Sequence, residues 1–264
     1  MPIGLLADIQ YADQEDTFTE GRCQRYREAP GKLQQAVKAF VAQEPQLSCV
    51  LTLGDIINGR HATQQEDIQD LDLVLELLQP LAAAGVPMHH TFGNHCLSLP
   101  RDMMLRRLAA IPSQDSKLGE EAAAYQEAHP LSEQEPHMHG WNGGIGSDQM
   151  RWLRQQLQRA DADGVNVICS CHHQLGPGAA RATHMAWNHK SILEVILGGA
   201  CVKLVLSGHD HMGGYACIQG KHFVTLEALL EAPSGANAFA TLDLLPKAII
   251  VTGHGSCRSR QLAI

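Results

Sequence analysis

The sequence predicts an α/β fold in which parallel strands alternate with helices, and three observations support this prediction. Short apolar runs without a helical period recur along the chain, which is typical of buried strands. In the first half, the segments between these runs carry apolar residues three to four positions apart, as on one face of a helix. Five of the strand-like runs lead into turns that carry Asp, Gln, Asn or His. In open α/β sheets, ligands bind at this end of the strands.

The first half of the chain predicts a strand–helix–strand–helix–strand unit, which implies parallel strands and right-handed crossovers. Its strands are expected at residues 4–7, 49–53 and 86–90. Its two helices are expected where apolar residues recur at helical spacing: Leu33, Val37, Phe40 and Val41, then Ile68, Leu71, Leu75 and Leu78. We expect Pro80 and Gly85 to end the second helix. Residues 11–28 are polar and charged and predict a loop over the ligand-binding edge.

The second half is less regular. A short helix is expected around residues 103–108, ending at Pro112, and Ser147 is expected to cap a helix that buries Met150, Leu153 and Leu157. Residues 113–146 show no convincing period. So long an irregular stretch indicates either a functional lid or a degenerate, shortened part of the fold.

The rest of the chain is rich in expected strands. A helix at residues 187–197, ended by Gly198-Gly199, lies between two of them, and the expected strands are 165–169, 202–206, 222–226, 238–244 and 248–251. A strand-rich tail indicates a second sheet packed on the first. Because no repeat or internal linker is present, we expect a single domain over residues 1–264.

Composition limits the functions that the chain can have. The 264 residues carry a net charge of −8, which argues against general binding to nucleic acid or to an anionic membrane. No apolar run approaches the roughly 18 residues of a membrane span, and the start of the chain lacks the features of a signal peptide. The eight cysteines form no CxxC pair, which favours reduced thiols. We therefore expect a cytoplasmic protein, and we also expect it to be a monomer.

The strand ends carry a set of residues suited to binding metal ions, namely Asp8, Asp55, Asn94, His172, His209 and His211. Taken singly, each has a simpler explanation. An Asp after a strand is usually a turn residue, Asn94 fits a left-handed turn, and a lone His172 would more often be a buried core histidine. Together, the positions and the oxygen and imidazole chemistry predict a two-metal centre, with one carboxylate shared between the ions.

Five short motifs occur in a fixed order: Asp8-x-Gln10, Gly54-Asp55-x-x-Asn58-Gly59, Gly93-Asn94-His95, His172 and Gly208-His209-x-His211. Together they resemble the signature of the metallophosphoesterase, or calcineurin-like, superfamily. Longer blocks resemble, more narrowly, the Mn-dependent ADP-ribose/CDP-alcohol diphosphatases: Ala7-Asp-Ile-Gln-Tyr-Ala-Asp13, Gly54-Asp-Ile-Ile-Asn-Gly59, His90-Thr-Phe-Gly-Asn-His-Cys96, Ala186-Trp-Asn188, Gly208-His-Asp-His-Met-Gly-Gly-Tyr215 and residues 226–233.

The resemblance implies a four-layer α/β/β/α sandwich, made of two mixed sheets flanked by helices, with a shortened middle part. It also implies that one divalent cation is held by Asp8, Gln10, Asp55 and His211, and a second by Asp55, Asn94, His172 and His209, so that Asp55 bridges them. The wider superfamily usually has a histidine at the position of Gln10. An amide oxygen is a harder donor than imidazole and favours Mn²⁺, with Mg²⁺ as the alternative.

The implied activity is hydrolysis of the phosphoanhydride in nucleoside-diphosphate compounds such as ADP-ribose and CDP-alcohols (CDP-choline, CDP-glycerol) by metal-activated water. His95 resembles the family's catalytic histidine, although a purely structural histidine is the alternative. Two other functions stay open. One is a phosphomonoesterase or cyclic-nucleotide phosphodiesterase on the same dinuclear site, and the other is a non-catalytic metal-binding interaction module.

The sequence says less about substrate recognition. Phe18, Arg25, Trp187 and Asn188 are candidates for binding the nucleotide, with ordinary packing as the alternative. Glu227 is either an acidic partner of a histidine ligand or a buried helix cap. His173, next to His172, is left outside the expected metal set.

Overall fold

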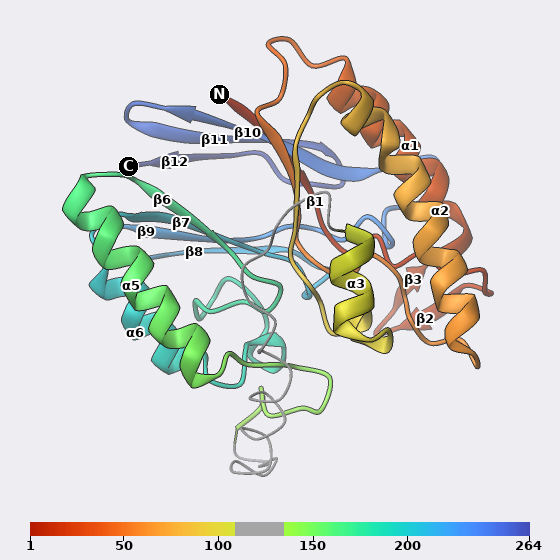
Figure 1. The fold of residues 1–264 in the computed structure, drawn as a ribbon, viewed down its shortest axis with the longest axis horizontal. Helices are drawn as coiled ribbons and strands as arrows, with labels where there is room; N and C mark the ends of the chain where they lie inside the picture. The colour runs from red at the N-terminus through yellow and green to blue at the C-terminus, as the bar shows by residue number, and fades with distance from the viewer. Residues whose placement is uncertain (109–134) are drawn as a thin grey trace.

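The computed structural model describes residues 1–108 and 135–264, and in this part of the chain two mixed sheets form the centre of the fold. Figure 1 shows the two sheets one above the other. The first sheet has the spatial order β12 (Arg260–Ala263), β11 (Ala248–Gly255), β10 (Ala238–Leu245), β1 (Pro2–Leu6), β4 (Cys49–Thr52) and β5 (Met88–His90). The second has the order β6 (Val167–Ser170), β7 (Val202–Ser207), β9 (Lys221–Thr225) and β8 (Gly214–Ile218).

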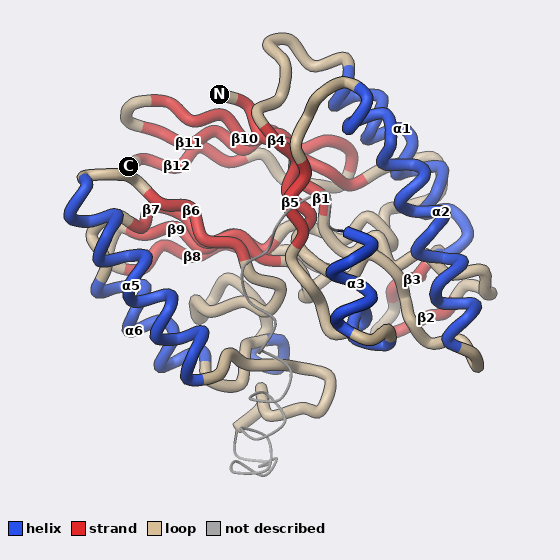
Figure 2. Tube along the Cα trace, in the orientation of Figure 1, coloured by secondary structure: helices blue, strands red, loops and turns tan. Residues whose placement is uncertain are grey.

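Helices cover the outer face of each sheet. Helices α1 (Ala29–Val41) and α2 (Gln64–Ala83) lie side by side against the first sheet, and α5 (Ser147–Asp163) and α6 (His189–Gly198) lie against the second (Figures 1 and 2). The remaining described helices are short: α3 (Arg101–Leu108), η1 (Tyr26–Glu28), η2 (His95–Ser98) and η3 (Ala182–His184). The predicted four-layer α/β/β/α sandwich is confirmed.

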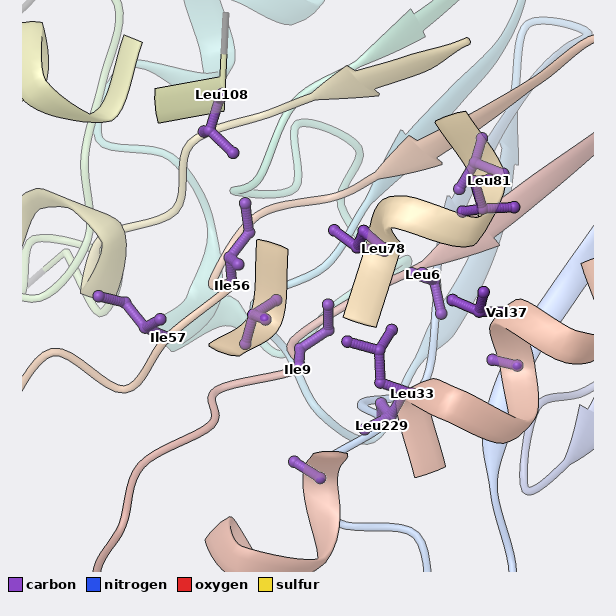
Figure 3. Close-up of a cluster of buried hydrophobic side chains, with 14 of the residues drawn as sticks. Leu6, Ile9, Leu33, Val37, Ile56, Ile57, Leu78, Leu81, Leu108 and Leu229 are labelled. Carbon is purple, nitrogen blue, oxygen red and sulfur yellow. The ribbon is translucent and has the colours of Figure 1, made fainter. Parts of the chain in front are cut away.

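Three buried apolar clusters hold the four layers together. Because side chains alternate along a strand, Leu6 of β1 faces the helices and Leu5 faces the other sheet. Figure 3 shows Leu6 among Leu33 and Val37 of α1 and Leu78 of α2. A second cluster lies between the two sheets, and a third lies beneath α5 and α6. The apolar side chains that form the three clusters are buried.

The expected parallel unit at the start of the chain is present. β1 pairs in parallel with β4, and β4 with β5. The expected end of the second helix was wrong, because α2 continues through Pro80 to Ala83. The added turn buries Leu81 completely, and the chain leaves the helix at Gly85, whose φ is +73°.

The start of α5 also differs from the prediction. Gly146 is the N-cap, and Ser147 is the first helical residue, so no side chain caps this end. The helix ends at Gly164, a left-handed C-cap with φ +66°.

The tail was expected to form the second sheet, but most of it extends the first. β10 pairs antiparallel with β1, with Ala240 opposite Leu5, and β11 and β12 follow. Of the strands that follow β7, only β9 and the unpredicted β8 join the second sheet. Local sequence does not specify which free sheet edge a strand will reach, and the open edge of β1 accepts β10.

Residues 11–28 were predicted as a loop, but they contain a small hairpin, β2 (Thr17–Thr19) and β3 (Arg22–Gln24). Its strands are exposed or half-buried, so no apolar alternation marks them. The turn residues Glu20 and Gly21 have φ values of +54° and +77°, as a two-residue hairpin turn requires.

Most of the irregular stretch predicted at 113–146, including Pro112 just before it, lies outside the described residues. Residues 135–146 are described, and they run as turns and loop toward α5. The assignment of the whole chain to one domain stays a prediction. Among the described residues, no helix is both long enough and apolar enough to cross a membrane.

Candidate metal centre

The predicted ligands lie where strands of both sheets end. Asp8 follows β1, Asp55 follows β4 and Asn94 follows β5 in the first sheet, whereas His172 follows β6 and His209 follows β7 in the second. Ligand atoms of Asp8, Asp55 and His172 all lie within 4.8 Å of one another. The strand order therefore brings residues from across the sequence to one point.

One group of candidate ligands beside Asp55 comprises Gln10, Asp8 and His211. Nε2 of Gln10 donates to Oδ2 of Asp55 at 3.0 Å, and Nε2 of His211 lies 3.6 Å from Oδ1 of Asp8. The nitrogen of the Gln10 amide faces Asp55, and a half-turn of the amide would present its oxygen instead. This group can supply oxygen and imidazole donors to one cation.

A second group comprises Asn94, His172 and His209. Nε2 of His172 is 3.1 Å from Oδ2 of Asp55, 3.2 Å from Oδ1 of Asn94 and 3.2 Å from Nδ1 of His209. A ring nitrogen of His173 also lies within 4.8 Å of those of His172 and His209, although His173 was left outside the predicted set. These atoms can supply the donors for a second cation.

Hydrogen bonds orient the histidine rings. Nδ1 of His172 donates to the carbonyl oxygen of Leu53 at 2.8 Å, and Nε2 of His209 donates to Oδ1 of Asn142 at 2.7 Å. Nδ1 of His211 donates to Oε1 of Glu231 at 2.7 Å. In each ring the other nitrogen faces the centre, which is how ligand histidines are held in metalloproteins.

The electrostatics of the site also fit divalent cations. Asp8 and Asp55 are fully buried. Burial raises the pKa of Asp8 to about 6, despite the nearby His211 and His172. Burial also acts to raise the pKa of Asp55, but the contact with His172 holds it below the usual range. Two buried carboxylates this close need positive charge beside them, and metal ions supply it.

The backbone is strained at the ligand positions. Asp8, Gln10, Asp55 and His209 have φ values of +50°, +42°, +50° and +69°, a region that costs a non-glycine residue about 1–3 kcal/mol. Two glycines make the close packing possible. A Cβ at Gly93 would lie 2.0 Å from Oδ1 of Asp55, and one at Gly208 would lie 2.6 Å from Oδ2 of Asp8. Such strain is typical of functional sites.

Two residues at the centre were not predicted. Asn142 was assigned only to an irregular, turn-rich stretch, and Glu231 lies four residues beyond the candidate Glu227. Glu227 itself contacts no histidine ligand, because its carboxylate accepts from the backbone N–H of Arg258 and lies 3.6 Å from Arg260. Glu231 reaches His211 because the chain after β9 returns to the first sheet, where the N–H of Leu230 donates to the carbonyl of Asp8.

A cavity of about 290 Å³ opens over the metal centre. His95 lies in its wall, with its backbone N–H donating to Oδ1 of Asp55 at 2.9 Å and its Nδ1 donating to the carbonyl oxygen of Asn58 at 2.5 Å. The cavity is also lined by cationic and aromatic side chains, namely Arg22, Arg60, Trp141, Arg181 and His184. It can hold an anionic molecule against the predicted metal ligands.

The four substrate-binding candidates from the sequence do not line this cavity. Phe18 is exposed on β2, and Arg25 donates to the carbonyl oxygen of Cys23. Trp187 and Asn188 hold the segment before α5, since Nε1 of Trp187 donates to the carbonyl of His139, and Nδ2 of Asn188 to that of Ile145. Their contribution is to place Trp141 and Asn142.

Comparison with known proteins identifies the family to which the chain belongs. The family profile described as calcineurin-like phosphoesterase matches residues 1–213. The chain belongs to this family, and the hydrolase class predicted from its motifs is confirmed.

The narrower resemblance is confirmed by individual relatives. The Mn-dependent ADP-ribose/CDP-alcohol diphosphatase of Arabidopsis thaliana is 30% identical over 97% of this chain and 94% of its own length. The mouse protein of the same name is 29% identical over 97% of this chain and 91% of its own length. A crystal structure of a dimetal phosphatase from Danio rerio has a TM-score of 0.84 and 27% identity, and the match covers 99% of this chain and 98% of that one.

The alignment with the mouse protein runs over 313 positions, whereas this chain has 264 residues. The mouse protein therefore has segments without a counterpart here.

Proposed function

We propose that this protein hydrolyses the phosphoanhydride of nucleoside-diphosphate compounds, such as ADP-ribose and CDP-alcohols, with two divalent cations. The observation that carries the proposal is the convergence of seven oxygen and imidazole donors from two sheets, with three histidine rings each fixed so that one nitrogen faces the centre. The names of the relatives supply the substrate class and the metal, Mn²⁺.

In this proposal, Asp8, Gln10, Asp55 and His211 hold one cation, and Asp55, Asn94, His172 and His209 hold the other. The contacts that pair Gln10 with Asp55, and His172 with both Asp55 and Asn94, support Asp55 as the shared ligand. Bound cations would activate a water molecule and neutralise charge on the phosphate oxygens. Burial and the other histidines hold the pKa of His209 well below its usual value, so this ring is neutral and can bind metal.

His95 is the proposed catalytic residue. Its Nδ1 is occupied by the carbonyl of Asn58, so Nε2 is the nitrogen that can exchange a proton with substrate. Burial lowers the pKa of His95, although Asp55 opposes this effect. An anionic phosphate beside Nε2 favours the imidazolium, which can then protonate the leaving oxygen.

The charge of the site suits a diphosphate. Two carboxylates and two divalent ions leave about two positive charges at the centre, although the chain as a whole carries −8. Trp141, which is 37% exposed, lines the cavity and offers an aromatic surface to a nucleobase. The substrate would therefore bind with its phosphates on the metal side of the cavity.

Hydrolysis assays with purified protein test the proposal. With Mn²⁺ we expect release of AMP from ADP-ribose and of CMP from CDP-choline, and no release by Asp55→Asn. p-Nitrophenyl phosphate and cyclic AMP serve as competing substrate classes in the same assay. A higher kcat/KM for either of these would assign the site to phosphomonoesters or cyclic diesters. If the protein hydrolyses none of these compounds with Mn²⁺ or Mg²⁺, the function that remains is that of a non-catalytic metal-binding module.

A further inference from the structure

Three arginines line the cavity, and two of them are already neutralised by carboxylates. Arg22 lies 2.9 Å from Oε2 of Glu231, and Arg181 lies 2.9 Å from Oδ1 of Asp210. Among the described residues, no carboxylate pairs with the third, Arg60. Its guanidinium is exposed at the wall of the cavity and can accept an anion without first breaking an ion pair.

The position of Arg60 is set by the loop that follows Asp55. Gly59, with φ +60°, packs against η2 so closely that a Cβ there would lie 2.5 Å from the carbonyl oxygen of His95. This contact places Nη2 of Arg60 3.3 Å from Nε2 of His95. The distance is at the long end of the hydrogen-bond range, so this contact is readily exchanged for a charge-assisted one.

A second unsatisfied group lies beside Arg60. Asn58 also lines the cavity, its side chain is 1% exposed, and both polar atoms of its amide lack a hydrogen-bond partner among the described residues. Leaving a buried amide without a partner is unfavourable, because its polar atoms have lost water and gained nothing in exchange. A ligand that accepts from Nδ2 of this amide would relieve part of that cost.

We propose that Arg60, with the amide of Asn58, binds the phosphate group of the substrate that is not attacked. This inference rests on the proposed function. When a phosphoanhydride is hydrolysed, the leaving oxygen belongs to the phosphate that is not attacked. His95 is the proposed proton donor to that oxygen, so a group beside His95 lies next to this phosphate. Arg60 is then a specificity-determining residue that favours diphosphates over monoesters.

The test compares Arg60→Gln and Arg60→Lys with the wild type, on ADP-ribose and on p-nitrophenyl phosphate, whose leaving group carries no phosphate. We expect Arg60→Gln to lower kcat/KM for ADP-ribose by about 10- to 100-fold, to change kcat/KM for p-nitrophenyl phosphate by less than about threefold, and Arg60→Lys to recover part of the loss. Arg159→Gln, which removes an exposed charge on α5, is the matched control and should change neither substrate.

Binding of α,β-methylene-ADP and of AMP, measured by calorimetry with Mn²⁺, separates this inference from the proposed function. We expect Arg60→Gln to weaken binding of the diphosphate analogue at least tenfold more than binding of AMP. If the wild type does not hydrolyse ADP-ribose but this binding difference is found, the proposed function fails and the subsite stands. Equal losses for both substrates and both ligands, or no loss, would overturn the role of Arg60.

Discussion

The orientation of single histidine rings decides whether the centre can bind metal. His211 keeps its Nε2 toward Asp8 because Nδ1 donates to Glu231, a buried carboxylate that also pairs with Arg22. Removing such a partner of a ligand histidine typically costs 10- to 100-fold in metal affinity.

We therefore predict that Glu231→Gln raises the Mn²⁺ concentration for half-maximal activity by about tenfold or more and changes kcat at saturating Mn²⁺ much less. Glu227→Gln is the matched control, since Glu227 is equally buried but contacts Arg258 and Arg260 rather than a ligand. Activity measured over a Mn²⁺ titration gives both values. Equal shifts in the two variants, or none in Glu231→Gln, would contradict this role.

A second residue, His90, makes the free energy of unfolding depend on pH. Burial lowers the pKa of His90, at the end of β5, to about 4 from its usual 6.5. The folded protein then keeps His90 neutral while the unfolded chain takes up a proton, so the contribution of His90 is complete above pH 6.5 and is lost as the pH falls toward 4.

Urea unfolding of the wild type and His90→Gln in EDTA, at pH 7, 5.5 and 4.5, isolates this effect. We predict that the free energy of unfolding of the wild type falls relative to that of the variant as the pH is lowered, because the variant cannot take up this proton. A difference between the two proteins that stays constant over the range would contradict the assignment.

Among the single residues of the site, the sequence predicted those that directly follow buried strands and missed those whose position depends on distant contacts. Asp8, Asp55, Asn94, His172 and His209 each follow a recognisable apolar run, and parallel strands deliver such residues to one edge. Asn142 and Glu231 follow no strand directly. Their contacts with His209 and His211 depend on how irregular segments pack, which local patterns do not encode.

At the scale of helices and strands, the starts of α2 and α5 differ in whether a side chain caps the helix. Thr63 accepts from the backbone N–H of Glu66, and the Glu66 side chain accepts from the backbone N–H of Thr63, a complete capping box at the start of α2. At the start of α5, Ser147 makes no such bond, because the N-cap is Gly146.

Thr63→Ala is therefore expected to lower the free energy of unfolding by about 1 kcal/mol, within the usual range for a lost N-cap. Ser147→Ala, the matched control, should change it by a few tenths of a kcal/mol at most. Urea titration measures both. A larger loss for Ser147→Ala than for Thr63→Ala would contradict the assigned caps.

The elements that the sequence predicted are those with a buried apolar face. β1, β4 and β7 are nearly continuous apolar runs, and α1 repeats its apolar residues at helical spacing. By contrast, β2 and β3 have three residues each and are exposed or half-buried, so they lack the apolar alternation that marks a strand. Their pairing comes from turn geometry and neighbouring strands.

On the scale of the whole molecule, the candidate centre joins the two sheets. Asp8, Asp55 and Asn94 come from the first sheet, and His172, His209 and His211 follow strands of the second. The motifs predicted both sheets, but not that β10, β11 and β12 complete the first one, because that pairing is set by which edge is free.

Metal bound between the sheets should stabilise the native state. At a free Mn²⁺ concentration of 100 times Kd, one such site contributes about 2.7 kcal/mol, so Mn²⁺ is expected to raise Tm by several degrees. Asp55→Asn should remove most of this increase, because it alters the proposed shared ligand. Thermal unfolding with and without Mn²⁺ measures the effect, and an equal increase in both proteins would place the stabilising ion elsewhere.

The metal content of the protein tests most directly whether these donors hold a pair of divalent cations. Protein saturated with Mn²⁺, freed of excess metal and measured by plasma mass spectrometry should contain two manganese ions per chain, and Asp55→Asn fewer than one. One ion or none in the wild type, or two in the variant, would contradict the dinuclear centre.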